Sequence, residues 1–398
     1  MVDAPIRPAI PPLAPYACHP EQSRGRVVDE PGSPTRTCFQ RDRDRIIHSG
    51  AFRKLKYKTQ VFVYHEGDYF RTRLTHSIEV AQIARSISRE LGLNEDLAEA
   101  VALAHDLGHT PFGHAGETAL AEAMQEVGGF DHNEQTFRVL TQLEQRYAEF
   151  DGLNLTWETL EGTVKHNGPL LNGEGNKPLP PTIASYNEAV DLELSGYASA
   201  EAQVAALADD IAYNNHDIDD GLRANLFTVA DIDELPLVGP MFRELLQRYP
   251  GLEQGRLIHE AIRRLINAMV NDLLSETRGR ITESGVDSAE AVRGLGAPLV
   301  AFSDAMRQND RALRDFLFAR MYRHYKVNRM TSKAKRVVRD LYAHYLSEPN
   351  CLPDDWQARA DGPGSPITAR LVGDYLAGMT DRYALAEHRK LFDIYSQI

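Results

Sequence analysis

The chain has 398 residues, a hydrophobic fraction of 42% and a net charge of −13, which supplies enough apolar material for a sizeable core and disfavours bulk nucleic-acid binding. No apolar run approaches the roughly 18 residues of a membrane helix, and the N-terminus lacks the basic and apolar regions of a secretory signal, so no membrane partner is expected. The three cysteines, Cys18, Cys38 and Cys351, are too few for a disulfide framework and fit a reducing compartment, so a cytoplasmic location is expected.

The N-terminal residues 1–35 contain eight prolines and are expected to form an extended arm, either a tail or a segment that wraps a neighbouring subunit. From Asp42 onward most segments show the periodicity of amphipathic helices joined by short polar loops, with no internal repeat. The predicted fold class is therefore all-α. Longer loops are expected at residues 170–182 and 353–366, and the first of these is either a lid or a plain surface insertion.

Two predicted helices bring histidines to defined positions. The first opens within residues 71–77 and carries His76 in its first turn. The second begins after Asn94, a plausible N-cap, and ends at the pair His105-Asp106, where glycines and a proline turn the backbone tightly. Such a pair is often only a capped helix end or a surface ion pair.

A third predicted helix, within residues 208–217, places Asp209, Tyr213 and Asp217 on one face at i, i+4 and i+8. With the histidines above, it completes a set of two nitrogen and two oxygen donors, which suits Mn²⁺, Mg²⁺, Fe or Zn²⁺ better than metals that prefer thiolates. Helical geometry alone does not choose between Asp209 and Asp210.

The spaced pattern of His76, His105-Asp106 and Asp209 resembles the HD-domain phosphohydrolases. Several further segments are similar to the dGTPase branch of that family, the deoxynucleoside triphosphate triphosphohydrolases: Lys58–Phe62, Arg71–Ser77, Pro111–His114, Asp209–Tyr213 and Gly378–Asp381. Other HD nucleotidases and cyclic-nucleotide phosphodiesterases share the four ligands but not the first and last of these segments. The resemblance runs from about Arg36 to the C-terminus. It implies cleavage of a dNTP between the deoxynucleoside and the α-phosphate, which releases tripolyphosphate.

The resemblance also implies a role for each matching residue. The metal ligands are His76, His105, Asp106 and Asp209, and they hold one divalent ion, with Mn or Mg favoured and Fe, Co or Zn as alternatives. The implied catalytic residues are His114, its carboxylate partner Glu117, and His109 against the phosphates. The implied substrate contacts are Gln60 and Arg73 at the nucleotide, Lys165 at the phosphates, Tyr213 beneath the deoxyribose and Asp217 at the 3′-hydroxyl.

The residue types fit this chemistry without the family. Phosphate transfer develops charge on non-bridging oxygens, which a metal and cationic side chains stabilise. Histidine is the side chain type suited to proton transfer in enzymes, so His114 can carry or relay a proton, and Glu117, three residues along, can orient it. The structural alternative is that both residues only cap the start of a helix.

The segment Arg320–Arg339 contains eight lysines or arginines and no acidic residue. Such a run is usually a solvated helix face, but it could also bind the polyphosphate, an effector nucleotide or single-stranded DNA, because Tyr322 and Tyr325 lie among the cations. The resemblance further implies a homo-oligomer.

The expected organisation is an N-terminal arm at 1–35, an HD-type core at 36–230 and a C-terminal helical region at 231–398 that completes the substrate pocket and the oligomer interface. Two other functions stay open: an HD phosphohydrolase acting on a nucleoside monophosphate, a cyclic dinucleotide or an alarmone, and a non-catalytic sensor of nucleotides or single-stranded DNA. The intact pair His114 and Glu117 counts against the sensor.

Overall fold

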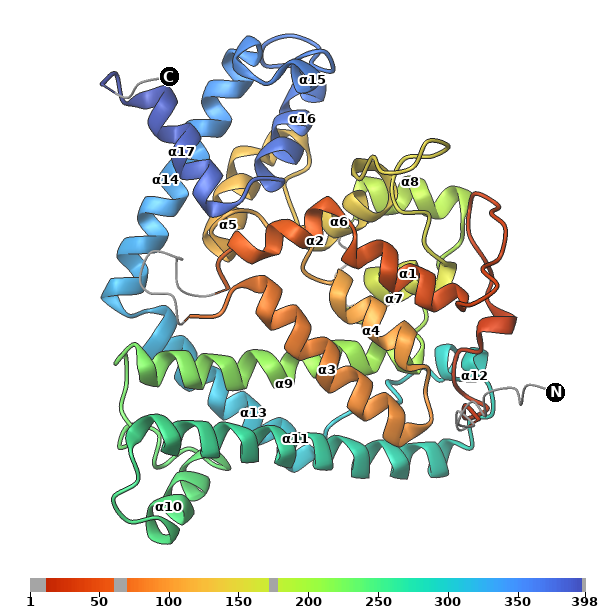
Figure 1. The fold of residues 1–398 in the computed structure, drawn as a ribbon, viewed down its shortest axis with the longest axis vertical. Coiled ribbons are helices and arrows are strands. Elements are labelled where there is room, and N and C mark those ends of the chain that lie inside the picture. Colours follow the sequence, from red (N-terminus) through yellow and green to blue (C-terminus); the bar gives the residue numbers. More distant parts are fainter. Residues whose placement is uncertain (1–11, 61–69, 172–177, 396–398) are drawn as a thin grey trace, which may run out of the picture.

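The computed structural model describes residues 12–60, 70–171 and 178–395. Every regular element in these ranges is helical, and the β-type pairing found there is confined to two isolated bridges, Thr59 with Thr72 and Gln145 with Gly152. The predicted all-α fold is confirmed (Figure 1).

The α-helices fall into an N-terminal and a C-terminal series. The first series is α1 (Cys38–Ile47), α2 (Gly50–Lys54), α3 (Arg73–Leu91), α4 (Glu95–Ala104), α5 (Gly113–Ala123), α6 (His132–Arg138), α7 (Trp157–Val164), α8 (Pro181–Ala189) and α9 (Ala200–Arg223). The second series is α10 (Val238–Arg248), α11 (Gln254–Ser284), α12 (Ala289–Arg293), α13 (Asp304–Leu317), α14 (Tyr325–Ser347), α15 (Asp354–Gln357), α16 (Pro366–Ala377) and α17 (Asp381–Phe392). Short 3₁₀ turns lie at Pro20–Gln22, Leu55–Tyr57, Gln125–Val127 and Pro349–Cys351, and π-helical turns at Val139–Leu143 and Phe318–Tyr322.

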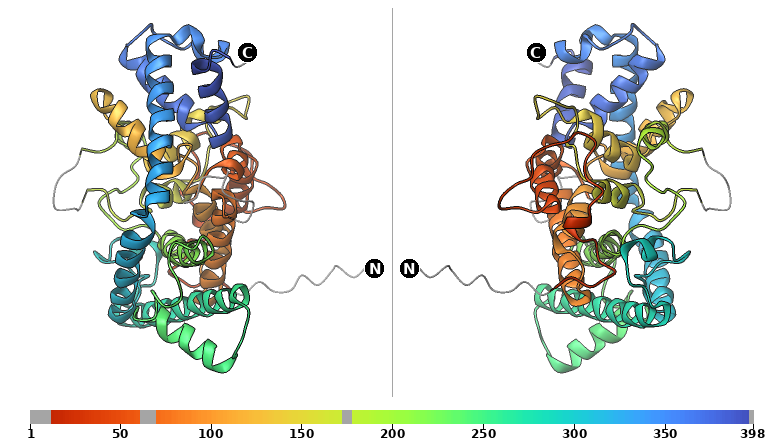
Figure 2. Two further views of the ribbon diagram at one scale, coloured as in Figure 1. Left: turned by 90° about the vertical axis from the view of Figure 1, so that its left-hand side faces the viewer. Right: turned by 90° about the vertical axis from the view of Figure 1, so that its right-hand side faces the viewer.

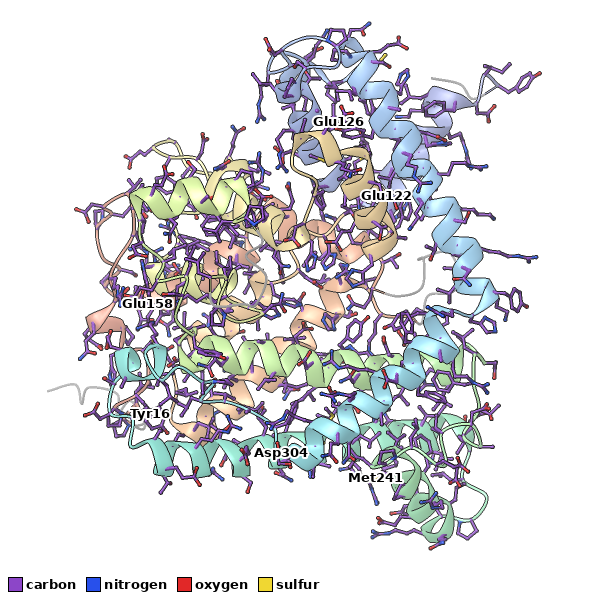
Figure 3. All side chains as sticks on the ribbon, turned by 180° about the vertical axis from the view of Figure 1, so that it is seen from behind. Tyr16, Glu122, Glu126, Glu158, Met241 and Asp304 are labelled. Carbon is purple, nitrogen blue, oxygen red and sulfur yellow. The ribbon has the colours of Figure 1, made fainter. Side chains whose placement is uncertain are left out.

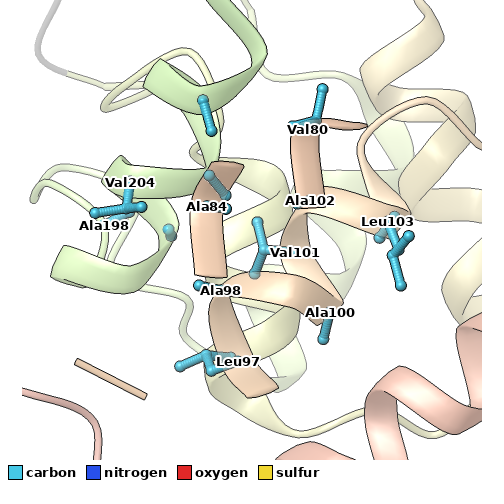
Figure 4. Packing of buried hydrophobic residues seen from close by; sticks show 14 of the residues in the cluster. Val80, Ala84, Leu97, Ala98, Ala100, Val101, Ala102, Leu103, Ala198 and Val204 are labelled. Atoms are coloured by element: carbon cyan, nitrogen blue, oxygen red, sulfur yellow. The ribbon is translucent and has the colours of Figure 1, made fainter. Parts of the chain in front are cut away.

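Helices α3, α4 and α9 pack against one another and form the centre of the largest hydrophobic cluster. The side chain of Asn94 accepts a hydrogen bond from the backbone N–H of Leu97, which confirms it as the N-cap of α4. The inward face of α4 includes Ala98 and Ala102, both fully buried, and small side chains at such positions let neighbouring helices approach closely (Figure 4). The end of α4 is therefore held firmly at the middle of the protein.

The hydrophobic core consists of three clusters that cross the expected boundary at residue 230. The first joins α1, α3, α4, α7 and α9 to α11; the second joins α5 to α14, α16 and α17; the third joins the end of α9 to α10, α11 and α13. Figures 1 and 2 show α14 running along one side of the molecule to the group formed by α15, α16 and α17. By its packing, α5 belongs with these C-terminal helices.

The described part of the N-terminal segment, residues 12–35, lies against its own chain and is not a free arm. The backbone N–H of Cys18 donates to the buried carboxylate of Glu201 at 2.8 Å, and the guanidinium of Arg26 lies 2.5 Å from Asp42. Ala17 and Cys18 are buried in the first hydrophobic cluster. The expectation of an extended arm is thus corrected for these residues, because buried carboxylates anchor the segment, while residues 1–11 lie outside the described ranges.

The two expected loops are only partly irregular. Helix α8 begins at Pro181, inside the first expected loop, whose residues 172–177 lie outside the described ranges. The second contains the single turn of α15. Among the described helices, none combines the length and the apolar character that a membrane crossing requires.

We expect Asp42 to be a main anchor of the N-terminal segment. Its carboxylate is fully buried, pairs with Arg26, and accepts hydrogen bonds from the backbone and hydroxyl of Thr156 and the hydroxyl of Thr159. Asp42→Ala should lower the free energy of unfolding in urea by about 3–5 kcal/mol, because it leaves a buried cation and several donors unpaired. The control Asp29→Ala, at an exposed position, should change it by less than about 0.5 kcal/mol. Equal effects would contradict the anchoring role.

Candidate active site

Two imidazoles and two carboxylates meet where α3, α4 and α9 pack together. His76 lies in the first turn of α3, His105 is the C-cap of α4, and Asp209 is in α9. The Nε2 atom of His76 is 2.8 Å from Asp209 Oδ1, and that of His105 is 3.6 Å from the same oxygen and 3.5 Å from Asp106 Oδ1. The structure thus brings together all four residues predicted as metal ligands.

Hydrogen bonds on the far side of each ring set its orientation. His105 Nδ1 donates to the carbonyl oxygen of Ala102 at 2.6 Å, which leaves Nε2 facing the carboxylates. His76 Nδ1 is 3.2 Å from His216 Nδ1, and His216 in turn contacts the carboxylate of Glu79 through Nε2. Such outer partners hold a ring in one tautomer and keep its other nitrogen free to act as a ligand.

The residues present fit a divalent cation. His105 Nε2 and Asp106 Oδ2 are buried, and neither has a hydrogen-bond partner within the part of the chain that the structure describes. An unsatisfied buried polar atom costs about 1–3 kcal/mol, and more for a charged group. A cation between them would satisfy both atoms. The ligand atoms of His76, His105 and Asp106 all lie within 4.8 Å of one another, which is the spacing that a shared ion requires.

Asp209 and its neighbour Asp210 face different partners. Burial would raise the pKa of Asp209, but the charge of His105 and hydrogen bonds from His166 and His76 hold it well below its usual range, so the carboxylate is ionised. Asp210 instead pairs with Arg314, whose guanidinium is 2.8 Å away. Only the first of the two carboxylates contacts the histidines of the cluster among the described residues.

Two further predicted site residues contact the carboxylate of Asp106. The guanidinium of Arg73 donates to Asp106 Oδ1 at 2.9 Å, and His109 Nε2 is 3.2 Å from the same oxygen. Burial, with the nearby charges of Arg73 and His132, holds the pKa of His109 well below its usual range, so its ring is neutral at pH 7. Arg73 Nε and His109 Nδ1 are buried without partners, so each can still take one.

Glu117 links two histidines beside this cluster. Its Oε2 is 3.0 Å from His114 Nδ1, and its Oε1 accepts hydrogen bonds from the backbone N–H and from Nδ1 of His132, the latter at 2.6 Å. Burial would raise the pKa of Glu117, but the hydrogen bonds from both histidines outweigh it and hold the pKa well below its usual range. Glu117 is thus ionised and fixes the His114 ring through Nδ1.

The sequence analysis did not single out His132, which reaches the site because Gly108 has no side chain. A Cβ on Gly108 would lie 2.1 Å from the backbone nitrogen of Thr136 and 2.3 Å from the carbonyl oxygen of His132. The start of α6 can therefore pack directly on the turn after α4, and the His132 ring stacks on His109 with their centroids 4.0 Å apart. The available sequence signal is a histidine directly after Asp131, the N-cap of a short helix.

A cleft beside His114 is lined by residues from both halves of the chain. Its lining includes the predicted residues Gln60, His114 and Tyr213, together with Tyr322 from the π-helical turn before α14. The two phenol oxygens lie 2.5 Å apart, and Tyr322 also donates to Asp217. Burial raises the pKa of Asp217 to about 8. Among the described residues, the buried atoms Gln60 Oε1 and Asp217 Oδ1 have no hydrogen-bond partner.

The structure does not bring Lys165 to the site. Its ammonium is buried, lies 3.1 Å from Glu161 and contacts the carbonyl oxygen of Tyr197, and Arg293 reaches the same glutamate. The next residue, His166, is the one that faces the cluster, with Nε2 3.4 Å from Asp209 Oδ2 and its ring stacked on His105. The expected phosphate contact at Lys165 is thus corrected, because α7 ends there and its last turn directs the lysine into an internal ion pair.

The predicted basic run lies mostly on the outside of α14. Arg320 pairs with Asp231, and Arg339 pairs with Glu122 of α5 at 2.6 Å; Figure 3 shows Glu122 beside α14. The exposed cations of the run that form no ion pair within the described residues are Arg323, Lys326, Arg329, Lys333 and Arg336. The aromatic Tyr322 lines the cleft, whereas these cations form a separate exposed surface.

Comparisons with known proteins agree with this arrangement. Residues 73–214 match the family model of the HD domain, and residues 300–390 match that of the phosphohydrolase-associated domain. The chain is 64% identical over 383 residues to a deoxyguanosinetriphosphate triphosphohydrolase-like protein of Parvibaculum lavamentivorans, covering 96% of this chain and 97% of that protein. Proteins with the same description from Caulobacter vibrioides and Brucella anthropi are 58% and 56% identical, again over 96% of this chain and over 97% and 95% of theirs.

The contrast between Asp209 and Asp210 gives a matched test of the metal site. Asp209→Ala should lose bound metal, measured by elemental analysis after incubation with Mn²⁺ and dialysis, because it removes a ligand that contacts His76. Asp210→Ala should keep the metal, because Asp210 pairs with Arg314. Metal retention in the first variant and loss in the second would reverse the assignment.

Proposed function

The chain belongs to the dGTPase-like family of HD-domain phosphohydrolases, and we propose that it hydrolyses a deoxynucleoside triphosphate such as dGTP to the deoxynucleoside and tripolyphosphate. One observation carries the proposal. His114 lines a cleft together with Gln60 and Tyr213, and at the same time it is held by Glu117 next to His109, which contacts Asp106 of the cluster. A substrate in the cleft would therefore present its first phosphate to the cluster.

We expect His76, His105, Asp106 and Asp209 to hold one divalent ion. Mn or Mg is favoured, with Fe, Co or Zn as alternatives, because the ligands mix imidazole nitrogen with carboxylate oxygen. When bound, the ion supplies positive charge to the attacked phosphate and polarises it. From the protein, the Arg73 guanidinium pairs with Asp106 through one nitrogen and keeps its Nε–H without a partner among the described residues, so it can donate to the phosphate group. His109, which contacts the same Asp106 oxygen, stays a predicted phosphate contact.

His114 is the proposed proton donor for the leaving group. Because Glu117 accepts a hydrogen bond from His114 Nδ1, the other ring nitrogen, Nε2, is the atom that can protonate the 5′-oxygen of the departing deoxynucleoside. The ionised Glu117 stabilises the positive charge of the His114 ring before transfer, and His132 holds Glu117 in place from its other oxygen. This arrangement favours cleavage between the 5′-oxygen and the α-phosphate.

The cleft suits a deoxyribose better than a ribose. We expect Tyr213, whose phenol bonds that of Tyr322 along one wall, to exclude a 2′-hydroxyl. Behind Tyr322, Asp217 Oδ1 can form a hydrogen bond with a 3′-hydroxyl, and Gln60 Oε1 can accept one from the nucleoside. Both atoms lack a partner among the described residues, and a polar nucleoside would satisfy them.

The cellular role that follows is control of the deoxynucleotide pool, in the cytoplasm. Binding of an effector nucleotide or of single-stranded DNA to the exposed cations of α14 stays a prediction, supported by the exposed ring of Tyr325, over which Arg329 lies. Assembly into a homo-oligomer also stays a prediction.

The reaction products test the proposal directly. Incubation with dGTP and Mn²⁺ should yield deoxyguanosine and intact tripolyphosphate in equal amounts. The products are measured by reversed-phase and anion-exchange chromatography. Asp209→Ala serves as the control, since activity that survives it comes from a contaminant. Release of dGMP and pyrophosphate, or no reaction with any of the four dNTPs, would instead favour an HD phosphohydrolase with another substrate.

His114→Ala should separate proton transfer from metal binding. We expect turnover to fall by about 10²–10⁴-fold with little change in KM, because the variant loses the proton donor but keeps every metal ligand. Metal content should equal that of the wild type. Glu122→Gln, on the same helix and paired with Arg339 at the surface, should retain wild-type turnover. Full activity in His114→Ala would mean that His114 and Glu117 only cap the start of α5.

A further inference from the structure

The described residues of the motif Lys58–Phe62, which are residues 58–60, meet the motif Gly378–Asp381 in a buried junction. The chain between them is more than 300 residues long, yet Lys58 and Thr59 both contact residues 377–381. Lys58, Thr59 and Asp381 are almost completely buried. Thr59 lines the cleft, whereas Lys58 and Asp381 are not among its lining residues, so the burial of these two charged groups calls for another explanation.

Lys58 connects the first of the two motifs to two carbonyl groups. Its ammonium donates to the carbonyl oxygen of His109 at 2.5 Å and to that of Ala377 at 2.8 Å. Ala377 is the last residue of α16, and the final carbonyls of a helix have no partner within it. One cation thus ties the end of α16 to the backbone of His109, next to Asp106.

Asp381, the first residue of α17, holds the other end of the same turn. One of its oxygens accepts from the backbone N–H of Phe112 at 2.8 Å, and the other accepts from the backbone N–H and the hydroxyl of Thr59. A single carboxylate therefore joins residue 59, beside Gln60 of the cleft, to residue 112, two positions before His114.

The turn between these two contacts has a conformation that requires support. Phe112 has φ of 65°, a left-handed conformation that costs a non-glycine residue about 1–2 kcal/mol. Gly113 follows with φ of 56°, and a Cβ there would lie 2.9 Å from the guanidinium of Arg73. Phe112 is also the N-cap of α5 but provides no side-chain cap, so the hydrogen bond to Asp381 helps to hold the start of this helix, together with the one from the Thr110 hydroxyl to the carbonyl oxygen of Gly113.

We propose that Lys58 and Asp381 are positioning residues, which fix the turn at residues 109–114 and thereby set the placement of His109 and His114 relative to the metal cluster. The C-terminal helices α16 and α17 thus hold the turn at residues 109–114 in its conformation. The role assigned to His114 rests on the proposed function, whereas the fixing of the turn does not.

Asp381→Asn tests the proposal with an almost isosteric change. The amide has one acceptor oxygen, so it cannot accept from both Phe112 and Thr59. We expect kcat for dGTP to fall by about 10- to 100-fold with KM nearly unchanged, since small displacements of reacting groups have effects of this size. Metal content should stay at the wild-type level, because no ligand is altered.

Hydrogen exchange gives a second measurement that does not depend on activity. In Asp381→Asn, peptides that contain the Phe112 amide should exchange faster, while peptides from the middle of α9 should not change. Glu387→Gln is the matched control, because it makes the same change on the same helix at a carboxylate that contacts only Tyr345 and Lys390. It should leave both kcat and the exchange at Phe112 unchanged.

Lys58→Met, with the exposed Lys56→Met as its control, repeats the test from the other side of the turn. Wild-type kcat and exchange in Asp381→Asn, or equal losses in Glu387→Gln, would overturn the proposal. If the wild-type protein hydrolyses no dNTP but exchange at Phe112 still rises in Asp381→Asn, the proposed function fails and the fixing of the turn stands.

Discussion

The carboxylate of Asp106 is the group on which most of the surrounding structure depends. It is buried, and a buried carboxylate is tolerated only where cations and donors surround it. Arg73 and His109 occupy one oxygen, and the other has no protein partner. These contacts fix the start of α3 and the turn after α4 relative to each other. A divalent cation at Asp106 Oδ2 would provide this buried oxygen with the partner that it lacks among the described residues.

The candidate site lies where the three hydrophobic clusters meet. The four predicted metal ligands lie in α3, in α9 and at the C-terminal end of α4 with the turn after it; α5 with His114 packs in the second cluster, and Tyr322 adjoins the third. The cleft is lined by members of the second and third clusters, among them Phe112 and Val327. Helices from the C-terminal half thus border a cleft beside predicted catalytic residues that all lie before residue 218.

The parts of this structure that follow from local rules could be predicted from the sequence. The N-cap at Asn94, the place of His76 in the first turn of its helix and the all-α class depend on neighbouring residues and on helical period. The direction of Lys165 could not be predicted, because it depends on Glu161 and on Arg293, which is distant in sequence. His132 was missed for the same reason, since its approach depends on the absence of a side chain at Gly108.

The contact between Lys58 and Ala377 spans 319 positions of the chain. During synthesis at about 5–20 residues per second, the lysine leaves the ribosome roughly 15–60 s before its partner carbonyl exists. In the later part of that interval, after Asp209 has been made, all the predicted metal ligands are present while Lys58 and the turn at His109 still lack their final restraints. The residues of the proposed metal site are thus made, in the life of a single chain, well before the helices that hold the turn carrying His114.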